Sequence, residues 1–204
     1  MKKLLIIWLC VFLLLSMAAC GNTRQETPTT GTTAASAPEE ATMDVVFSAK
    51  FLNVAELSPE GWIDSLNELG QGQYADLYVN PDGESVTLKL TQEQKKFWMQ
   101  LVFNGLELLT EEFCDIKDTY QVTYTDDLGC LDFYYDLDLP ATSAIHYVIY
   151  FEVYCAFGQL LNAPDEEGWF VDFNIYNSDT GKLVTSGDSD MGLSYEPSDW
   201  EASK

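Results

Sequence analysis

The stretch YADLYVNPDGESVTLKLTQEQKKFWMQLVFNGLELLTEE, residues 74–112, holds a hairpin and a helix in direct succession. Two strand-like runs flank the tripeptide Pro-Asp-Gly at 81–83, which is a strong turn signal. Thr91 followed by Gln94 has the spacing of a capping box, and apolar residues then recur at helical spacing to about Glu112. We therefore predict a β-hairpin that leads directly into a helix.

Two more hairpins are predicted further along the chain, each with Asp shortly before Gly in its turn. The three hairpins pair residues 74–80 with 84–91, 118–125 with 130–138, and 168–177 with 182–186. Their turns recur about every 50 residues, which is typical of a duplicated unit. Turn chemistry alone produces the same pattern, so both explanations stay open.

A helix is predicted over 58–70, upstream of the first hairpin. Ser58 suits the N-cap, Pro59 the first helical position and Gly70 the position just after the helix. Residues 45–54 before it have the composition of a short strand.

The stretch 140–162 fits either a helix or a buried strand by its apolar pattern. Its length favours a helix, because strands rarely exceed about ten residues. The helix would be capped by Ser143 or Thr142, with Ile149 at the centre of its buried stripe. Three polar side chains within it argue against a membrane span: His146, Glu152 and Gln159.

These elements predict an α+β fold in which an antiparallel sheet of about three hairpins has two or three helices packed on one face. Residues 43–190 are expected to form one domain, since their length suits a single core. Residues 191–204 are acidic and weakly patterned, and we expect a loosely held C-terminal tail.

The N-terminal segment has the layout of a secretory signal peptide. Lys2 and Lys3 precede an apolar run over 4–15, and the sequence LLLSMAAC then ends at Cys20. Small residues directly before a cysteine resemble the lipobox of bacterial lipoproteins, although Met17 stands where that motif prefers Leu.

The resemblance implies that residues 1–19 are removed and that the Cys20 thiol carries a diacylglyceryl group. It also implies an extracytoplasmic protein anchored to a bacterial membrane by this lipid. The alternatives are an ordinary signal peptide and an uncleaved anchor. The anchor is disfavoured because the apolar run is shorter than the roughly 20 residues that cross a bilayer.

Residues 20–42 contain no large apolar side chain after Cys20 and are predicted to form a flexible tether. As a coil, the tether would hold the domain roughly 25 Å from the membrane.

The chain is strongly acidic, with a formal net charge of −23. Loss of Lys2 and Lys3 with the leader would bring the formal charge to about −25. Such a surface repels nucleic acid and anionic lipid, so we exclude nucleic acid as a partner. The charge is typical of a soluble extracellular domain, or of a protein with a basic partner.

Three cysteines remain after Cys20: Cys114, Cys130 and Cys155. We expect Cys155 to be buried, and Cys114 and Cys130 are a candidate disulfide. No Cys-x-x-Cys pair occurs and His146 is the sole histidine, so no structural zinc site and no cofactor are predicted.

No catalytic set is predicted. His146 has no nucleophile motif beside it, and the paired carboxylates Asp136 and Asp138 would share the solvated face of a strand. The acidic triplets 165–167 and 188–190 lack the spacing of a calcium loop, so no metal site is predicted.

The tryptophans provide the remaining candidates. Trp62 and Trp98 lie on helical stripes and should be core residues, whereas Trp169 and Trp200 are candidates for ligand binding through an exposed indole. The prediction is a non-catalytic module that binds a protein, peptide or glycan at the cell envelope. The alternatives are a small hydrolase using paired carboxylates and an assembly factor for an envelope machine.

Overall fold

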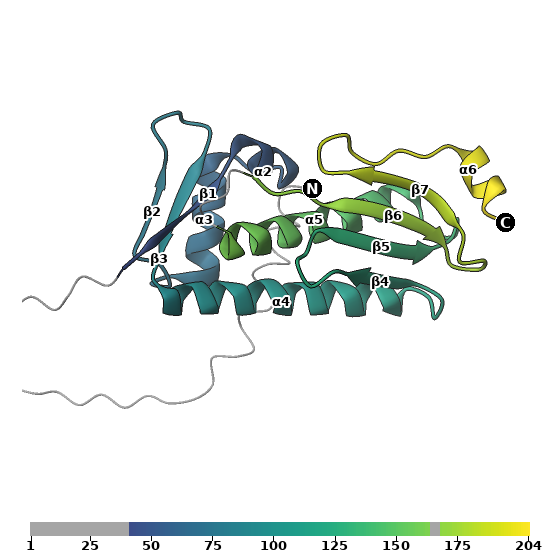
Figure 1. The fold of residues 1–204 in the computed structure, drawn as a ribbon, viewed down its shortest axis with the longest axis horizontal. Helices are drawn as coiled ribbons and strands as arrows, with labels where there is room; N and C mark the ends of the chain where they lie inside the picture. Colours follow the sequence, from purple (N-terminus) through teal and green to yellow (C-terminus); the bar gives the residue numbers. More distant parts are fainter. Residues whose placement is uncertain (1–40, 164–167) are drawn as a thin grey trace, which may run out of the picture.

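The computed structural model describes residues 41–163 and 168–204 (Figure 1). The leader, Cys20 and nearly all of the tether lie outside these residues, so the predictions for them stay predictions. The described elements are β1 (Met43–Phe47), α2 (Ala49–Val54), α3 (Pro59–Gly70), β2 (Asp76–Val79), β3 (Val86–Leu90), α4 (Gln92–Asp115), β4 (Gln121–Tyr124), β5 (Cys130–Tyr135), α5 (Ala141–Asn162), β6 (Asp172–Asn177), β7 (Leu183–Asp188) and α6 (Pro197–Ala202). The predicted α+β class is confirmed.

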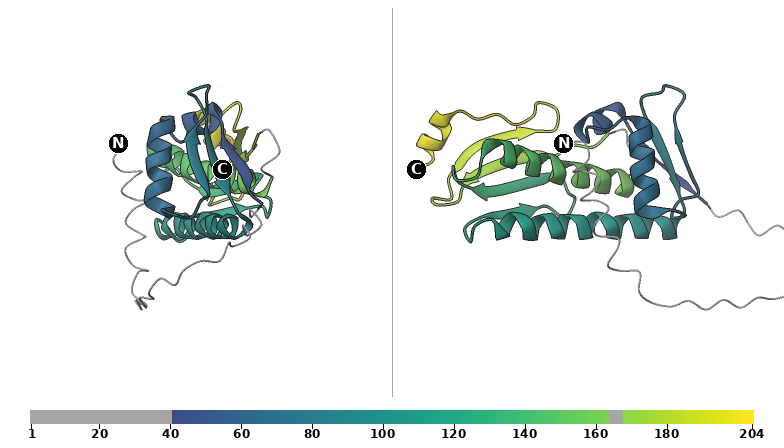
Figure 2. Two further views of the ribbon diagram at one scale, coloured as in Figure 1. Left: turned by 90° about the vertical axis from the view of Figure 1, so that its left-hand side faces the viewer. Right: turned by 180° about the vertical axis from the view of Figure 1, so that it is seen from behind.

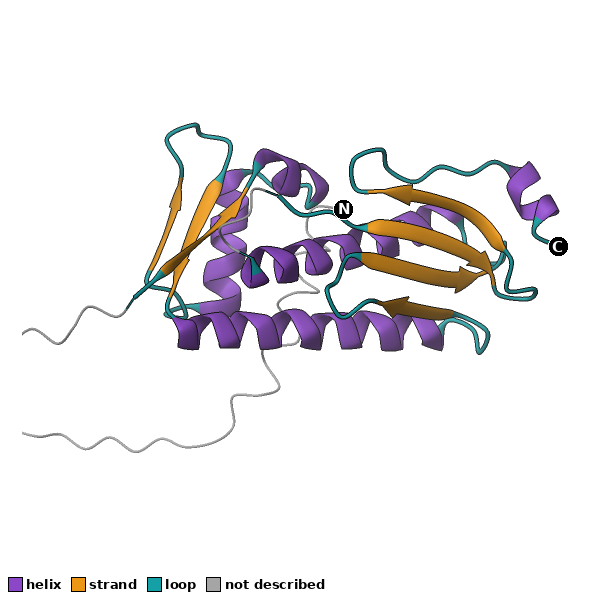
Figure 3. Cartoon of the chain, viewed as in Figure 1, coloured by secondary structure: helices purple, strands orange, loops and turns teal. Residues whose placement is uncertain are grey.

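The strands form two sheets instead of one (Figure 3). The first is antiparallel with the order β1-β3-β2, and the second has the order β4-β5-β6-β7. The expectation of one wholly antiparallel sheet was wrong, because β5 and β6 run parallel across the connection made by α5. The three predicted hairpins correspond to β2–β3, β4–β5 and β6–β7.

Helices α4 and α5 pack side by side and cover one face of the four-stranded sheet, while its other face is free of helices (Figures 1 and 2). An aromatic core connects the layers. Phe133 of β5 contacts Phe151 of α5 and Phe113 of α4, with ring centroids 5.4 Å and 5.7 Å apart. Trp62 and Trp98 are buried, as predicted.

The cap of α3 is as predicted, since the Ser58 hydroxyl accepts a hydrogen bond from the Gly61 amide at 3.1 Å. Gly70 is still helical, which corrects its predicted place after the helix. A Cβ atom at Gly70 would lie 2.6 Å from the Trp98 ring, so the glycine is needed for packing. The predicted strand 45–54 divides into β1 and α2, because Ser48 caps a new helix.

The prediction of a helix over 140–162 is confirmed by α5, but two details were wrong. Its N-cap is Pro140 without a side-chain hydrogen bond, instead of Ser143 or Thr142. Its core face contains Val148, Phe151 and Cys155, and the predicted centre Ile149 is only half-buried. Because α5 is apolar around most of its circumference, periodicity alone does not select the buried face.

The C-terminal segment is also corrected. Instead of a loose tail, it contains α6, whose Trp200 is 2% exposed and packs against Tyr135 with ring centroids 5.4 Å apart. The amide of Asn177 donates a hydrogen bond to the Ser203 hydroxyl at 3.0 Å. The buried indole and this hydrogen bond both hold the acidic segment against the sheet.

Candidate functional site

An apolar hollow lies between α4 and α5, and we call it the helical groove. It has a volume of ≈ 280 Å³. Apolar and tyrosine side chains on facing helical stripes line most of it: Leu69, Leu101, Gly105, Leu108, Leu109, Glu112, Ser143, His146, Tyr147, Tyr150, Val153, Tyr154 and Phe157. A groove with apolar walls and few polar groups is typical of a binding site.

Gly105 allows α5 to contribute an aromatic side chain to the floor of the groove. A Cβ atom there would lie 2.2 Å from the Tyr154 ring, so only glycine accommodates the ring in this position. Glycine in the middle of a helix costs about 1 kcal/mol relative to alanine. This close packing explains why α4 contains glycine at its centre.

The groove is a desolvating environment. Burial raises the pKa values of Tyr147, Tyr150 and Glu112, and it raises the pKa of Tyr154 to about 12. The exposed His146 stacks on Tyr150, with centroids 6.4 Å apart and ring planes 15° apart. Charged or strongly hydrated ligand groups are therefore disfavoured on the groove floor.

The outer side of α5 continues this apolar surface, and Ile145 is 45% exposed. By length and composition, α5 is the one helix among residues 41–163 and 168–204 that could cross a membrane, but 56% of its apolar window is buried in the domain. It is thus a core helix with one uncovered side. A helix that is apolar all round normally has a partner on every side.

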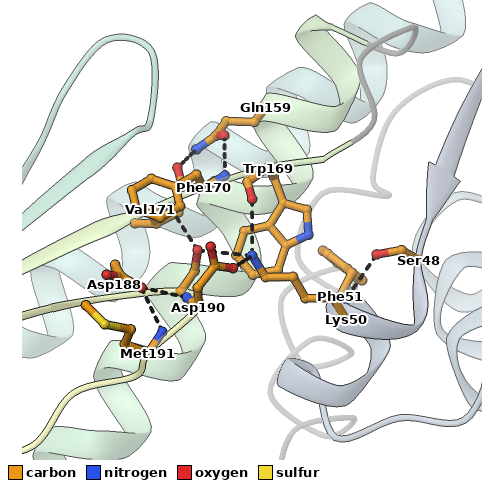
Figure 4. Close-up of polar contacts among 11 residues, drawn as sticks. Ser48, Lys50, Phe51, Gln159, Trp169, Phe170, Val171, Asp188, Asp190 and Met191 are labelled. Carbon is orange, nitrogen blue, oxygen red and sulfur yellow. Dashed lines mark hydrogen bonds and ion pairs between the residues drawn. The ribbon is translucent and has the colours of Figure 1, made fainter.

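A second cluster joins α2 to the end of the four-stranded sheet (Figure 4). The Lys50 ammonium lies 4.3 Å from the centroid of the Trp169 ring and 2.5 Å from Asp190 Oδ1. It also donates to the Ser189 hydroxyl at 3.4 Å. These contacts make the cluster an ion-pair and cation–π link between α2 and the sheet.

The paired carboxylates lie after β5 and not within it, which corrects the expectation of a shared solvated face. Asp136 is 8% exposed, whereas the side chain of Asp138 is 80% exposed. Lys117 forms ion pairs with both. Burial raises the pKa of Asp136, but hydrogen bonds from Lys117 and Tyr120 outweigh burial and leave that pKa lowered.

The structure buries both candidate tryptophans. Trp169 is 5% exposed and Trp200 is 2% exposed, so neither presents an open stacking surface. The free face of the sheet carries Tyr134 and Tyr176, whose rings stack on each other with centroids 4.7 Å apart. Both rings are half-buried, and each covers one face of the other.

The three cysteines among the described residues form no disulfide. Cys155 is buried as predicted and burial raises its pKa to about 12, while Cys114 and Cys130 are both free thiols. In the part of the chain that the structure describes, no cluster of His, Cys, Asp or Glu could hold a metal ion. The acidic stretch at 165–167 lies outside the described residues.

Comparisons with protein-family models, with curated proteins and with solved structures find no match for this chain. The helical groove was missed from sequence because its residues look like ordinary core positions. Gly105 was the one available signal, since a glycine at the centre of a long helix indicates close packing.

Proposed function

We propose that this protein is a membrane-tethered extracytoplasmic lipoprotein that binds a partner protein at the cell envelope and catalyses no reaction. The leader and Cys20 support the location. The helical groove supports binding, and it is the observation on which this proposal depends. The occupant is a basic amphipathic helix of the partner.

The dimensions of the groove suit a helix. The stripe on α5 extends from Ser143 to Phe157, which corresponds to about 20 Å at 1.5 Å per residue. Helix α4 provides the opposite wall with Leu101 and Leu108. A third helix of about four turns would place its apolar side chains between these two rows.

The charge of the partner follows from the charges around the groove. Glu112 is the one acidic residue among the lining residues, and Glu111, its neighbour in α4, is exposed. The chain as a whole has a net charge of −23. Lys and Arg beside the apolar face of the partner helix would be attracted, whereas an anionic membrane would be repelled.

Two arrangements favour binding over catalysis. In the described residues His146 stacks on Tyr150, and no hydrogen bond joins it to a serine, threonine or cysteine. The carboxylates of Asp136 and Asp138 share the Lys117 ammonium, so a hydrolase based on this pair would first have to break that ion pair.

Fluorescence anisotropy of a labelled synthetic peptide tests the proposal on the full chain. The probe is a Leu/Lys helix of about 15 residues with all leucines on one face, and its control has the same composition in scrambled order. We expect the amphipathic peptide to bind at least about tenfold more tightly than the scrambled one.

Variants of the groove residues test whether the peptide binds in the helical groove. Val153→Asn and Leu108→Asn should each weaken binding about tenfold, whereas Leu183→Asn, at an apolar position on β7, should leave it unchanged. Raising salt from about 0.05 M to about 0.5 M should slow association roughly tenfold. Equal affinity for the two peptides would contradict the proposal. So would an affinity for the amphipathic peptide that is the same in the wild type and in the groove variants.

A further inference from the structure

A second hollow, the strand-end pocket, lies at the carboxyl ends of the two parallel strands and has a volume of ≈ 300 Å³. Asp136 and Asp138 lie within three residues of the end of β5, and Asp179 and Thr180 lie within three residues of the end of β6. In sheets with parallel strands, ligands bind outside the carboxyl ends of those strands. The pocket shares no lining residue with the helical groove.

One wall of the pocket is held in place by a closed set of hydrogen bonds. Lys117 donates to Asp136 and, at 2.8 Å, to Asp138. Asp136 Oδ1 also accepts from the Tyr120 hydroxyl at 2.8 Å and from the Asp138 amide at 2.9 Å. The hydrogen bonds to Asp136 and Asp138 raise the pKa of Lys117, so its ammonium stays charged. A wall fixed in this way is preorganised for a ligand.

The pocket contains hydrogen-bonding capacity that the described residues do not use. An ammonium has three N–H donors, and Lys117 directs two of them at carboxylates. The Asp179 carboxylate accepts no hydrogen bond within the described residues. Trp200 also lines the pocket, and its Nε1, like those of Trp62 and Trp169, is buried without a partner in the described part of the chain. Unsatisfied buried donors are rare in native structures.

The chemistry of these groups selects the ligand. Carboxylates accept hydrogen bonds from hydroxyl groups, and the ammonium donates one. Three aspartates disfavour an anion. Two lysines also line the pocket, Lys204 and the Lys117 that pairs with Asp136 and Asp138, and their charges disfavour a further cation. We propose that the strand-end pocket binds a neutral sugar unit, with Asp138 and Asp179 accepting from its hydroxyl groups.

Nuclear magnetic resonance of the ¹⁵N-labelled full chain tests this proposal independently of the groove. The signal is the indole N–H resonance of Trp200, assigned by its loss in Trp200→Phe. Titration with N-acetylglucosamine should shift this resonance with saturation and a Kd on the order of 1 mM. Sodium phosphate and methylammonium chloride are the anionic and cationic probes, and neither should produce a saturable shift.

Variants decide whether the shift comes from the pocket. Asp179→Asn and Asp138→Asn should each weaken sugar binding about tenfold, while Asp64→Asn, exposed on α3, should not change it. Asp138 and Asp179 are exposed, so their variants should fold normally. The proposal is overturned if the sugar gives no saturable shift up to about 100 mM, if phosphate or methylammonium binds instead, or if both pocket variants bind like the wild type.

Discussion

Glu152 should make the fold less stable as pH rises, and Glu152→Gln should remove this effect. The side chain lies on α5 and is 7% exposed. Burial raises its pKa from 4.5 to about 7, although the positive charge of Lys50 on α2 opposes the shift. No hydrogen bond to its carboxyl group is present among the described residues.

The direction of this pH effect follows from proton binding. Between about pH 4.5 and about pH 7 the folded protein holds a proton on Glu152 that the unfolded chain has lost, so the free energy of unfolding falls as pH rises through this window. One pKa unit corresponds to about 1.4 kcal/mol, which gives a loss of about 3 kcal/mol that is complete above about pH 7. Glutamine is neutral at every pH and nearly isosteric, so the variant avoids this loss.

Urea unfolding followed by circular dichroism, between about pH 5 and about pH 8, measures the effect. Glu152→Gln should be more stable than the wild type by about 3 kcal/mol at the upper end, and the difference should vanish toward the lower end. Glu111→Gln removes an exposed carboxylate of α4 and is the matched control, with no such trend. The difference in unfolding free energy between two variants does not contain the effects of titrating groups that both variants have. Parallel stability curves for wild type and Glu152→Gln would refute the reasoning.

Three further predictions concern anchoring and packing. Cys20→Ser should move the protein from the membrane fraction to the medium or to an uncleaved precursor, and unchanged fractionation would rule out lipid attachment. Gly70→Ala should lower the free energy of unfolding by about 1–3 kcal/mol in chemical denaturation, because the new methyl group would lie 2.6 Å from the Trp98 ring. A gain in stability of about 1 kcal/mol, the value of helix propensity alone, would show that the ring moves aside freely. Phe151→Ala should cost about 3–5 kcal/mol, whereas Ile145→Asp, on the exposed side of α5, should cost less than about 1 kcal/mol, and the reverse order would place the core on the other face.

Local signals in the sequence predicted most elements correctly, because caps and turns depend on neighbouring residues. The Ser58 cap and the capping box of Thr91 and Gln94 are both present in the structure. Long-range pairing was not predictable in this way. Nothing in the turns of the hairpins indicates that β5 and β6 would be parallel neighbours, since their adjacency depends on where α5 packs.

The burial of individual side chains was the other feature that the sequence did not predict. Trp169 and Trp200 are surrounded in sequence by acidic and polar residues, which favoured exposure. In the fold, Phe51 and Lys50 of α2 cover Trp169, and Tyr135 and Tyr195 cover Trp200. These partners are distant in the chain for the most part, so pattern and composition could not identify them. The helical groove was missed for the same reason.

The most direct test of groove binding is a photo-crosslinking map on the full chain. A benzophenone on the central apolar residue of the amphipathic Leu/Lys peptide should react with α4 and α5 near Leu108 and Tyr150. Peptide mapping by mass spectrometry locates the crosslinked residues. Crosslinks concentrated on these two stripes, and lost in Val153→Asn, are the predicted result. Crosslinks on the free face of the sheet, or scattered over the acidic surface, would contradict the groove as the binding site.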